Sequence, residues 1–238
     1  MEKIYIVGAG CGDPELITVK GKKLLDKADV LIYAGSLVNP VLVEECPANE
    51  KYDSWGMKLS EMTKIMIDAA KAGKIVVRLH SGDPSLYGAI IEQVALLEKE
   101  GIKTERIPGV SSMFGAAAAL GIQLTLRGVS ESVIITRPAG TTLKSDQIAE
   151  MSKLGQTMVI FLGTEHMEEV FNKVECPSDT PAAVVYRATW PDQKVIRGTV
   201  SDIAKKARDA GIEKTALLII GNVVDAVNSG YVNSYLYE

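Results

Sequence analysis

Short, uninterrupted runs of apolar residues alternate with helical patterns in the first half of the sequence. The runs are Ile4–Val7, Val30–Tyr33 and Ile75–Leu79. Before the third run, apolar side chains recur at helical spacing, at Met62, Ile65, Met66, Ala69 and Ala70. Strands that are apolar throughout are buried on both faces, which is typical of a parallel sheet covered by helices. The first half therefore predicts an α/β domain.

The second half has a different pattern. The runs Ala183–Tyr186 and Val195–Gly198 lie close enough in the sequence to form a hairpin. A helix is expected to be capped by Ser201 and to end at Gly211. Strands and helices in this order predict a mixed sheet. We therefore expect two α/β domains, an N-terminal one with a parallel sheet over 1–113 and a C-terminal one over 114–238.

Composition excludes several classes of function. The net charge is −4, and no block of basic residues is interleaved with aromatic ones, so we expect no nucleic-acid partner. No apolar run approaches the roughly 18 residues of a membrane span, and the N-terminus does not resemble a signal peptide. Cys11, Cys46 and Cys176 lie far apart, and His80 and His166 are the only histidines, so we expect no metal. The sequence predicts a cytoplasmic protein without membrane contact.

The segment after the third run carries the most specific chemistry. Gly82 permits a tight turn, and Asp83 places a carboxylate where the strand ends. Ligands bind at the carboxyl ends of strands in open α/β sheets, and a carboxylate suits a cationic or hydroxyl-bearing ligand. Pro84 is expected to open a helix. The alternative interpretation is a plain strand–turn–helix junction in which Asp83 caps the helix.

A glycine-rich loop, Gly8–Asp13, follows the first strand. A dinucleotide fingerprint needs a third glycine at the position of Asp13, where a carboxylate would repel pyrophosphate. The second strand also lacks a following acidic residue, because Tyr33 leads into Ala34. Nicotinamide-dinucleotide binding is therefore disfavoured. The glycines still predict a close approach to the backbone.

Three segments in a fixed order resemble the signatures of the tetrapyrrole (corrin/porphyrin) methyltransferases. They are GAGCGDPELITVKG at 8–21, VVRLHSGDPSLYG at 76–88 and IPGVSS at 107–112. The similarity runs through nearly the whole chain, to TALLIIG at 215–221. Long segments in order are far more specific than a lone glycine motif. The chain is therefore identified as a member of this family.

Within the family, two further segments are most similar to members that methylate precorrin-4 at C11 in cobalamin synthesis. They are YAGSLVNPVLVEE at 33–45 and VVYRATWPDQKVIRGT at 184–199. Cys11 departs from the proline that is common in the family, and Trp55 departs from a small residue. The first departure changes the contact expected in the first glycine loop. The second changes the shape expected of the surface that faces the substrate. The cobalt-containing substrate is the expected one, and metal-free precorrin-4 is the alternative.

The resemblance implies two α/β domains with a cleft between them, usually in a homodimer. It also implies S-adenosyl-L-methionine as the cofactor, S-adenosyl-L-homocysteine as its product and a tetrapyrrole as the substrate. Carried over onto this sequence, the cofactor contacts fall on small and backbone-presenting residues: Cys11, Ser81, Gly82, Asp83, Leu86, Ser111, Ser112, Leu162, Ala188, Thr215, Ala216 and Leu217.

Substrate and catalytic candidates adjoin these segments. Trp55 and Tyr87 are expected to stack on the macrocycle, and Arg187 to pair with its carboxylates. Arg78 and His80 are the catalytic candidates. Arg78 is expected to bind the carboxylates of the substrate. His80 is expected to orient the substrate or to move a proton. Each has a plainer alternative, namely core packing, a surface ion pair or a hydrogen-bonded histidine. Methyl transfer needs alignment and a dry site more than a nucleophile–base triad.

Two other functions remain open from the sequence. The chain is either a C11-methyltransferase or a relative that methylates another tetrapyrrole position, such as C2/C7 or C17. A non-catalytic module that binds the cofactor is the third possibility. The intact Gly82–Pro84 and Pro108–Gly109 segments speak against loss of the site.

Overall fold

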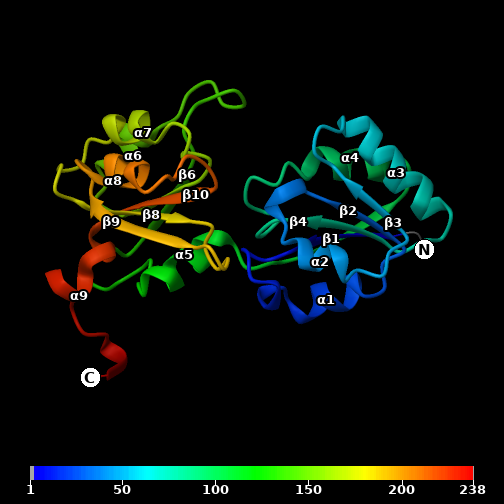
Figure 1. Ribbon diagram of the computed structural model, residues 1–238, viewed down its shortest axis with the longest axis horizontal. Helices are drawn as coiled ribbons and strands as arrows, with labels where there is room; N and C mark the ends of the chain where they lie inside the picture. The colour runs from blue at the N-terminus through cyan, green and yellow to red at the C-terminus, as the bar shows by residue number, and fades with distance from the viewer. Residues whose placement is uncertain (1–2, 238) are drawn as a thin grey trace. The chain divides into compact units, whose positions relative to one another are not determined.

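The computed structural model describes residues 3–237, and the chain divides after Ser112 into two compact units. The N-terminal unit holds a five-stranded, wholly parallel sheet in the order β3-β2-β4-β1-β5 (Figure 1). Its strands are β1 Lys3–Gly8, β2 Val30–Tyr33, β3 Glu50–Asp53, β4 Val76–His80 and β5 Lys103–Ile107.

Helices cover both faces of this sheet. Leu25 and Leu42 pack with Leu31 on one face, and Met66 packs with Ile32 on the other. The helices are α1 Val19–Leu25, α2 Pro40–Glu44, α3 Leu59–Lys71 and α4 Ile91–Lys99, with short 3-10 turns at Pro14–Leu16 and Gly35–Leu37. The prediction of a parallel sheet buried on both faces is confirmed.

The C-terminal unit holds a mixed sheet in the order β6-β7-β10-β8-β9. Only β6 and β7 pair in parallel, and the predicted hairpin is the antiparallel pair β8–β9. The predicted mixed α/β arrangement is therefore confirmed. The strands are β6 Val133–Thr136, β7 Thr157–Ile160, β8 Pro181–Tyr186, β9 Lys194–Thr199 and β10 Ala216–Ile220.

The helices of this unit pack against its sheet (Figure 1). Ile148 of α6, Val170 of α7 and Ile203 of α8 share a core with Val184 and Leu218 of the sheet. No helix among the described residues is long and apolar enough to cross a membrane. The helices are α5 Ser112–Leu120, α6 Ile148–Ser152, α7 Met167–Lys173, α8 Ile203–Asp209 and α9 Ala226–Ser229.

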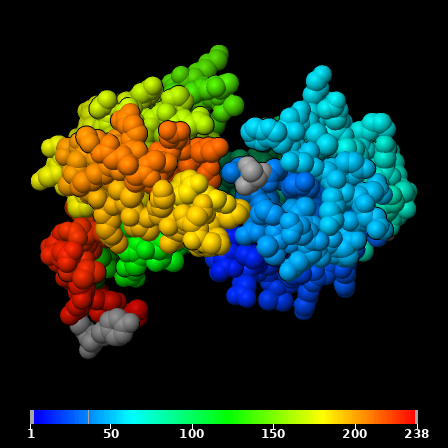
Figure 2. Space-filling model, in the orientation of Figure 1, coloured from blue at the N-terminus to red at the C-terminus, as the bar shows by residue number. Residues whose placement is uncertain are grey.

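Two arginines contact the outer segments of the C-terminal unit. Arg197 of β9 donates hydrogen bonds to the carbonyls of Leu120 and Val224, and so connects the sheet to α5 and to the turn before α9. The guanidinium of Arg127 lies over the ring of Tyr235, 3.2 Å from its centroid, in the last described segment (red in Figure 2).

The N-terminus of α8 differs from the prediction. Asp202, not Ser201, is the N-cap residue of α8. The Asp202 carboxylate accepts a hydrogen bond from the backbone N–H of Thr199 at 2.8 Å, and it pairs with Lys206 one turn later at 2.6 Å. The helix therefore begins one residue later than predicted, with Asp202 in place of Ser201 as its N-cap.

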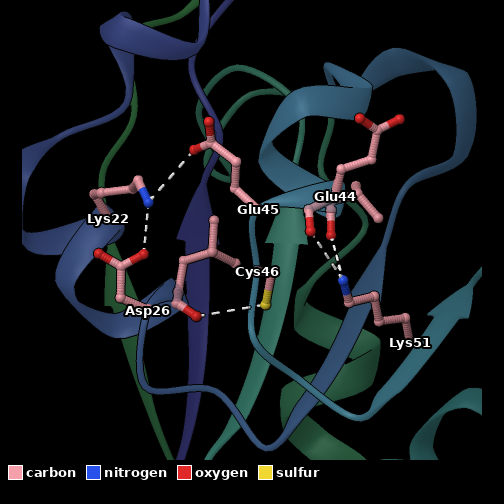
Figure 3. A network of polar contacts seen from close by, with 8 residues as sticks. Lys22, Asp26, Glu44, Glu45, Cys46 and Lys51 are labelled. Carbon is pink, nitrogen blue, oxygen red and sulfur yellow. Dashed lines mark hydrogen bonds and ion pairs between the residues drawn. The ribbon is translucent and has the colours of Figure 1, made fainter.

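Ion pairs and hydrogen bonds connect the residues at the ends of α1 and α2 (Figure 3). Lys22 pairs with Asp26 at 2.5 Å, and Lys51 of β3 donates to the carbonyl of Glu44 at the end of α2, at 3.4 Å. The Cys46 thiol donates to a backbone carbonyl of α1 at 3.4 Å. Burial raises the pKa of the Cys46 thiol, so it packs as a neutral group and not as a nucleophile.

Candidate functional site

Three loops meet at the carboxyl edge of the parallel sheet, because they follow the adjacent strands β4, β1 and β5. They are the first loop (residues 9–13), the second loop (81–90) and the third loop (108–111). The first and second loops are bonded through their backbones. Gly82 N–H donates to the Gly10 carbonyl at 2.8 Å, and Ala9 N–H donates to the His80 carbonyl at 2.7 Å.

Glycines let these backbones approach one another without side chains between them. A Cβ atom on Gly109 would lie 2.2 Å from the Gly82 carbonyl oxygen and 2.8 Å from the Gly8 Cα. A Cβ atom on Gly8 would lie 2.6 Å from the Gly109 Cα. Real Cβ atoms do not occupy such positions, and backbone cannot move aside as a flexible side chain can. Gly8 and Gly109 are therefore required by the fold of the site.

The Asp83 carboxylate connects the second loop to the third. One oxygen accepts from the Gly109 N–H at 2.9 Å, and the other accepts from the N–H of Ser85 at 2.8 Å and from its hydroxyl. Burial acts to raise the pKa of Asp83, but these hydrogen bonds from Ser85 and Gly109 outweigh it and hold the pKa below its usual value. This bridging role was missed from the sequence. Direct contact of Asp83 with a cofactor stays a prediction.

The expectation that Pro84 opens a helix is wrong. Residues 84–87 form a turn, and α4 begins at Ile91. Tyr87 and Ala89 have φ values of +53° and +47°, which no right-handed helix accommodates. Asp83 is therefore a turn residue and not a helix cap.

Backbone strain is concentrated in the segments that the resemblance identified. Six non-glycine residues in the described part of the chain have positive φ. Two lie in the second loop, and the others lie at one edge of the C-terminal sheet. Strained backbone persists where the surroundings enforce it, and it clusters at binding sites. The six residues are Tyr87, Ala89, Leu162, Arg187, Thr189 and Thr215.

The C-terminal unit brings its own predicted cofactor residues to one sheet edge. Strand β10 runs antiparallel to both β7 and β8, so its start lies beside their ends. Arg187 N–H donates to the Thr215 carbonyl at 3.0 Å, and the Thr164 hydroxyl donates to the Ala216 carbonyl at 2.9 Å. Leu162 is 63% exposed beside them, whereas Ala188 is buried.

A hollow of about 270 Å³ opens beside this edge, within the C-terminal unit. Its lining includes Leu162, Thr215 and the basic residues Arg137 and Lys214. Arg137 donates to the Thr142 hydroxyl at 2.7 Å and so holds the loop after β6 in a fixed shape. The hollow thus adjoins two of the predicted cofactor residues.

Arg78 is buried on β4, with 6% of its surface exposed. Its Nη1 donates to the Leu79 carbonyl at 3.2 Å and to the Ile32 carbonyl at 3.5 Å. Its Nε has no hydrogen-bond partner in the described structure. Burial lowers the pKa of Arg78 to about 10, with Asp53 opposing the shift.

His80 lies two residues further along β4 and is partly buried. Its Nδ1 lies 2.8 Å from the Ser81 carbonyl oxygen, and the backbone of Gly88 also hydrogen-bonds with the ring. Burial is the main cause that lowers the pKa of His80, and the Arg78 cation adds to it against the Ser81 carbonyl. The imidazole is therefore neutral near pH 7.

The substrate candidates have different surroundings. Trp55 is 83% exposed just after β3, and Tyr87 is 41% exposed in the second loop. Arg187 pairs with Asp192 at 2.5 Å and lies over the ring of Trp190, 4.0 Å from its centroid. The surface ion pair that the sequence left open for Arg187 is therefore present. Substrate contacts of all three candidates stay predictions.

Two residues that hold the loops were missed from the sequence. The Asn39 amide donates to the Gly12 carbonyl at 2.8 Å. The Thr18 hydroxyl caps α1 by accepting from Gly21 N–H at 3.1 Å, and it donates to the Pro108 carbonyl at 3.4 Å. A polar residue just before a helix signals a cap in both cases, but the second partner is distant in sequence.

The remaining predicted residues lie at the same edge of the N-terminal unit. Cys11 is partly exposed in the first loop, and Ser111 is buried in the third. A Cβ atom on Gly82 would lie 3.7 Å from the Ser111 Cα, so the second and third loops are in contact there. All three cysteines are free thiols. Within residues 3–237, no three His, Cys, Asp or Glu side chains gather as metal ligands would.

Known proteins resemble this chain along nearly its whole length. The family profile described as Tetrapyrrole (Corrin/Porphyrin) Methylases matches residues 3–204. Cobalt-precorrin-4 C(11)-methyltransferase of Methanocaldococcus jannaschii is 50% identical over 242 residues, which cover 99% of this chain and 93% of that protein.

Two solved structures share the fold. The X-ray structure of a cobalamin biosynthetic enzyme, cobalt precorrin-4 methyltransferase, matches with a TM-score of 0.91 and 44% identity, over 94% of this chain and 96% of that one. Uroporphyrin-III C-methyl transferase from Thermus thermophilus, complexed with S-adenyl homocysteine, matches with a TM-score of 0.80 and 29% identity, over 93% and 98%.

Gly109→Ala is expected to destabilise the protein by about 1–3 kcal/mol, because the new methyl group meets backbone atoms of two other segments. Gly140→Ala is the matched control, since a Cβ atom there meets nothing within 4 Å and its φ is not positive. Its free energy of unfolding should change by no more than about 0.5 kcal/mol. Urea denaturation followed by circular dichroism measures both. Equal stability of the two variants would contradict the close approach.

Asp83→Asn is expected to be less stable than the wild type at pH 7, with a difference that shrinks in acid. The native state lowers the pKa of Asp83, so its contribution is present above the unfolded-state pKa of about 3.9 and is lost as the pH falls through the native value. Urea midpoints of both proteins between pH 7 and pH 3 measure this. A difference independent of pH would refute the carboxylate's role.

Proposed function

We propose that this chain, which belongs to the tetrapyrrole (corrin/porphyrin) methylase family, transfers a methyl group from S-adenosylmethionine to C11 of cobalt-precorrin-4. The observation that carries the proposal is the bonded set of three loops at the carboxyl edge of β4, β1 and β5. The names of the relative from M. jannaschii and of the cobalt precorrin-4 methyltransferase structure support both the position and the cobalt.

The loops have the chemistry that a cationic cofactor needs. None of the residues 9–13, 81–90 and 108–111 is Lys or Arg, and Asp83 contributes a carboxylate. Opposite charge and the absence of like charge favour a sulfonium and an ammonium group. Small residues and glycines present backbone N–H and C=O groups, which suit a close-fitting site. The S-adenyl homocysteine in the structure of the Thermus relative supports this assignment.

The second unit is proposed to contribute the residues at its strained edge: Leu162, Ala188, Thr215, Ala216 and Leu217. The positive φ values of Leu162 and Thr215 support this role, because they hold backbone groups in directions that relaxed chain does not offer. We also propose that the protein is cytoplasmic and forms a homodimer, as the family resemblance implies.

The cofactor supplies an electrophilic methyl group when it is bound. The chain's own task is to hold the macrocycle carbon in line with that methyl group and to exclude water. The reaction turns an electron-rich carbon into a quaternary one, so the macrocycle releases a proton. His80 is proposed to accept or relay that proton, because burial lowers the pKa of His80 and leaves a neutral imidazole near pH 7 that can take up a proton. The plainer alternative, a purely structural histidine, predicts no effect on the pH profile of turnover.

Mass spectrometry of the tetrapyrrole product tests the proposal directly. Purified protein is incubated with S-adenosylmethionine and either cobalt-precorrin-4 or precorrin-4, and fragmentation locates the added methyl group. One methyl at C11 of cobalt-precorrin-4 is expected. Transfer to metal-free precorrin-4 alone would correct the substrate. Transfer at C2/C7 or C17 would overturn the position, and cofactor binding without any transfer would favour a non-catalytic module.

A further inference from the structure

The hollow at the edge of the C-terminal sheet is lined by three segments next to adjacent strands. Residues 137–142 follow β6, residues 162–166 follow β7, and Lys214 and Thr215 precede β10. Strands β6 and β7 are parallel and β10 runs antiparallel to β7, so all three segments meet at one edge. The hollow has a volume of about 270 Å³. A water molecule occupies about 30 Å³ in the liquid, so a carboxylate on a short aliphatic arm fits there.

Lys214 is a cation of this lining that is free to pair with a ligand. Its side chain is exposed and makes no ion pair or hydrogen bond with any residue from 3 to 237. The next residue, Thr215, has a φ of +57°, and its carbonyl accepts from the Arg187 N–H at 3.0 Å. The backbone that carries Lys214 is therefore held in place beside the hollow.

Arg137 supplies a second cation and shapes one wall. Its Nη1 donates to the Thr142 hydroxyl at 2.7 Å, and its Nη2 donates to the Thr142 carbonyl at 3.2 Å. Within the same loop, the Gly140 N–H donates to the Leu143 carbonyl at 2.8 Å, and the Leu143 N–H donates to the Gly140 carbonyl at 3.2 Å. A ligand therefore meets a wall that is already ordered, which lowers the entropy lost on binding.

The acidic groups around the hollow do not cancel this charge. Asp146, which closes the loop after β6, pairs with Lys173 at 3.1 Å and lies outside the lining. Glu165 is the one acidic residue among the described residues of the lining. His166 also lines the hollow, and its Nδ1 lies 3.7 Å from a carboxylate oxygen of Glu169. Two permanent cations and one carboxylate leave the lining net positive, which favours an anionic ligand.

The apolar part of the lining indicates which anion fits. Leu162 is 63% exposed and has a φ of +54°, so strained backbone holds a hydrocarbon side chain in water beside the cations. A ligand that covers this side chain gains the free energy of apolar burial. Inorganic phosphate has no hydrocarbon with which to do so. A carboxylate on an aliphatic arm pairs with a cation and also covers Leu162.

The place of the hollow indicates which molecule brings this carboxylate. Leu162 and Thr215 belong both to the lining and to the edge that we propose for the cofactor. A ligand in the hollow therefore lies next to the cofactor residues of this unit. The acceptor of a methyl group must lie next to the cofactor that donates it.

We propose that this hollow binds a side-chain carboxylate of the tetrapyrrole, with Lys214 pairing with the carboxylate and Leu162 contacting its aliphatic arm. Arg137 adds positive charge and keeps the wall in shape. The proposal rests on the proposed function, because it takes a tetrapyrrole with carboxylate side chains from there. The carboxylate of S-adenosylmethionine has the same chemistry, and the test separates the two sources.

The test substitutes Lys214, because an exposed and unpaired side chain can be changed without disturbing the fold. Lys214→Met removes the charge, Lys214→Glu reverses it, and Lys214→Arg keeps it. Lys205→Met is the matched control for net charge, since Lys205 is an exposed lysine of α8 outside the hollow. Absorbance titration in the presence of S-adenosylhomocysteine gives the affinity for cobalt-precorrin-4 without turnover. Calorimetry gives the affinity for S-adenosylhomocysteine alone.

Lys214→Met is expected to weaken cobalt-precorrin-4 binding about threefold to fivefold, as the loss of one exposed ion pair does. Lys214→Glu should weaken it about tenfold or more, because like charges repel. Lys214→Arg and Lys205→Met should bind within about twofold of the wild type, and S-adenosylhomocysteine affinity should stay within about twofold throughout. Added salt should weaken cobalt-precorrin-4 binding more in the wild type than in Lys214→Met.

Three results would overturn the proposal. Loss of S-adenosylhomocysteine affinity alone would assign the hollow to the cofactor. Unchanged cobalt-precorrin-4 affinity in both Lys214→Met and Lys214→Glu would show that no carboxylate pairs with Lys214. Equal losses in Lys214→Met and Lys205→Met would indicate a general effect of net charge.

Failure of the proposed function gives a different result. A wild type whose cobalt-precorrin-4 affinity depends on Lys214, but which adds no methyl group at C11, would refute the proposed function and leave this inference standing. Methyl transfer to C11 with an affinity that is independent of Lys214 would do the reverse.

Discussion

The candidate site depends on a backbone contact between segments that are about a hundred residues apart in sequence. Gly8 ends β1, Gly109 follows β5, and neither has room for a Cβ atom. Asp83 then closes the arrangement by accepting the Gly109 N–H. Backbone contact of this kind fixes three loops on a rigid sheet with few side chains between them. The result is an edge of small and glycine residues, on which the loops carry the carboxylates of Asp13 and Asp83 and no Lys or Arg.

Charge is divided along that edge. The loops over β4, β1 and β5 are free of Lys and Arg, whereas Arg78, within β4, is a buried cation whose Nε has no hydrogen-bond partner among the described residues. His80 lies on the same strand as Arg78 and remains neutral, because burial and the neighbouring cation both disfavour its charged form.

The strands of the parallel sheet were predictable from the sequence, because a strand buried on both faces is an uninterrupted run of apolar residues. Ile4–Val7 and Val30–Tyr33 are apolar at nearly every position, and both lie inside the parallel sheet. The local turn chemistry was less accessible. Pro84 permits a helix, but the positive φ values of Tyr87 and Ala89, which the surrounding fold enforces, exclude one. No local pattern shows such enforcement.

The site residues divide in the same way. Glycines after β1 predicted a close backbone approach, but the partner, Gly109, is visible only in three dimensions. The cofactor contacts proposed for Leu162 and Thr215 rest on family resemblance, since neither residue type signals a binding site. Arg78 stood out because of its position beside a signature. Its missing counter-ion is a property of packing, and no sequence pattern reports it.

Hydrogen exchange measured with and without S-adenosylhomocysteine tests the central claim most directly. The account predicts slower exchange of backbone amides in residues 9–13, 81–90 and 108–111 when the ligand is bound. Residues 175–180, before β8 at the opposite edge of the C-terminal sheet, should exchange at the same rate in both states. Confirmed binding with no protection in the three loops would contradict the account.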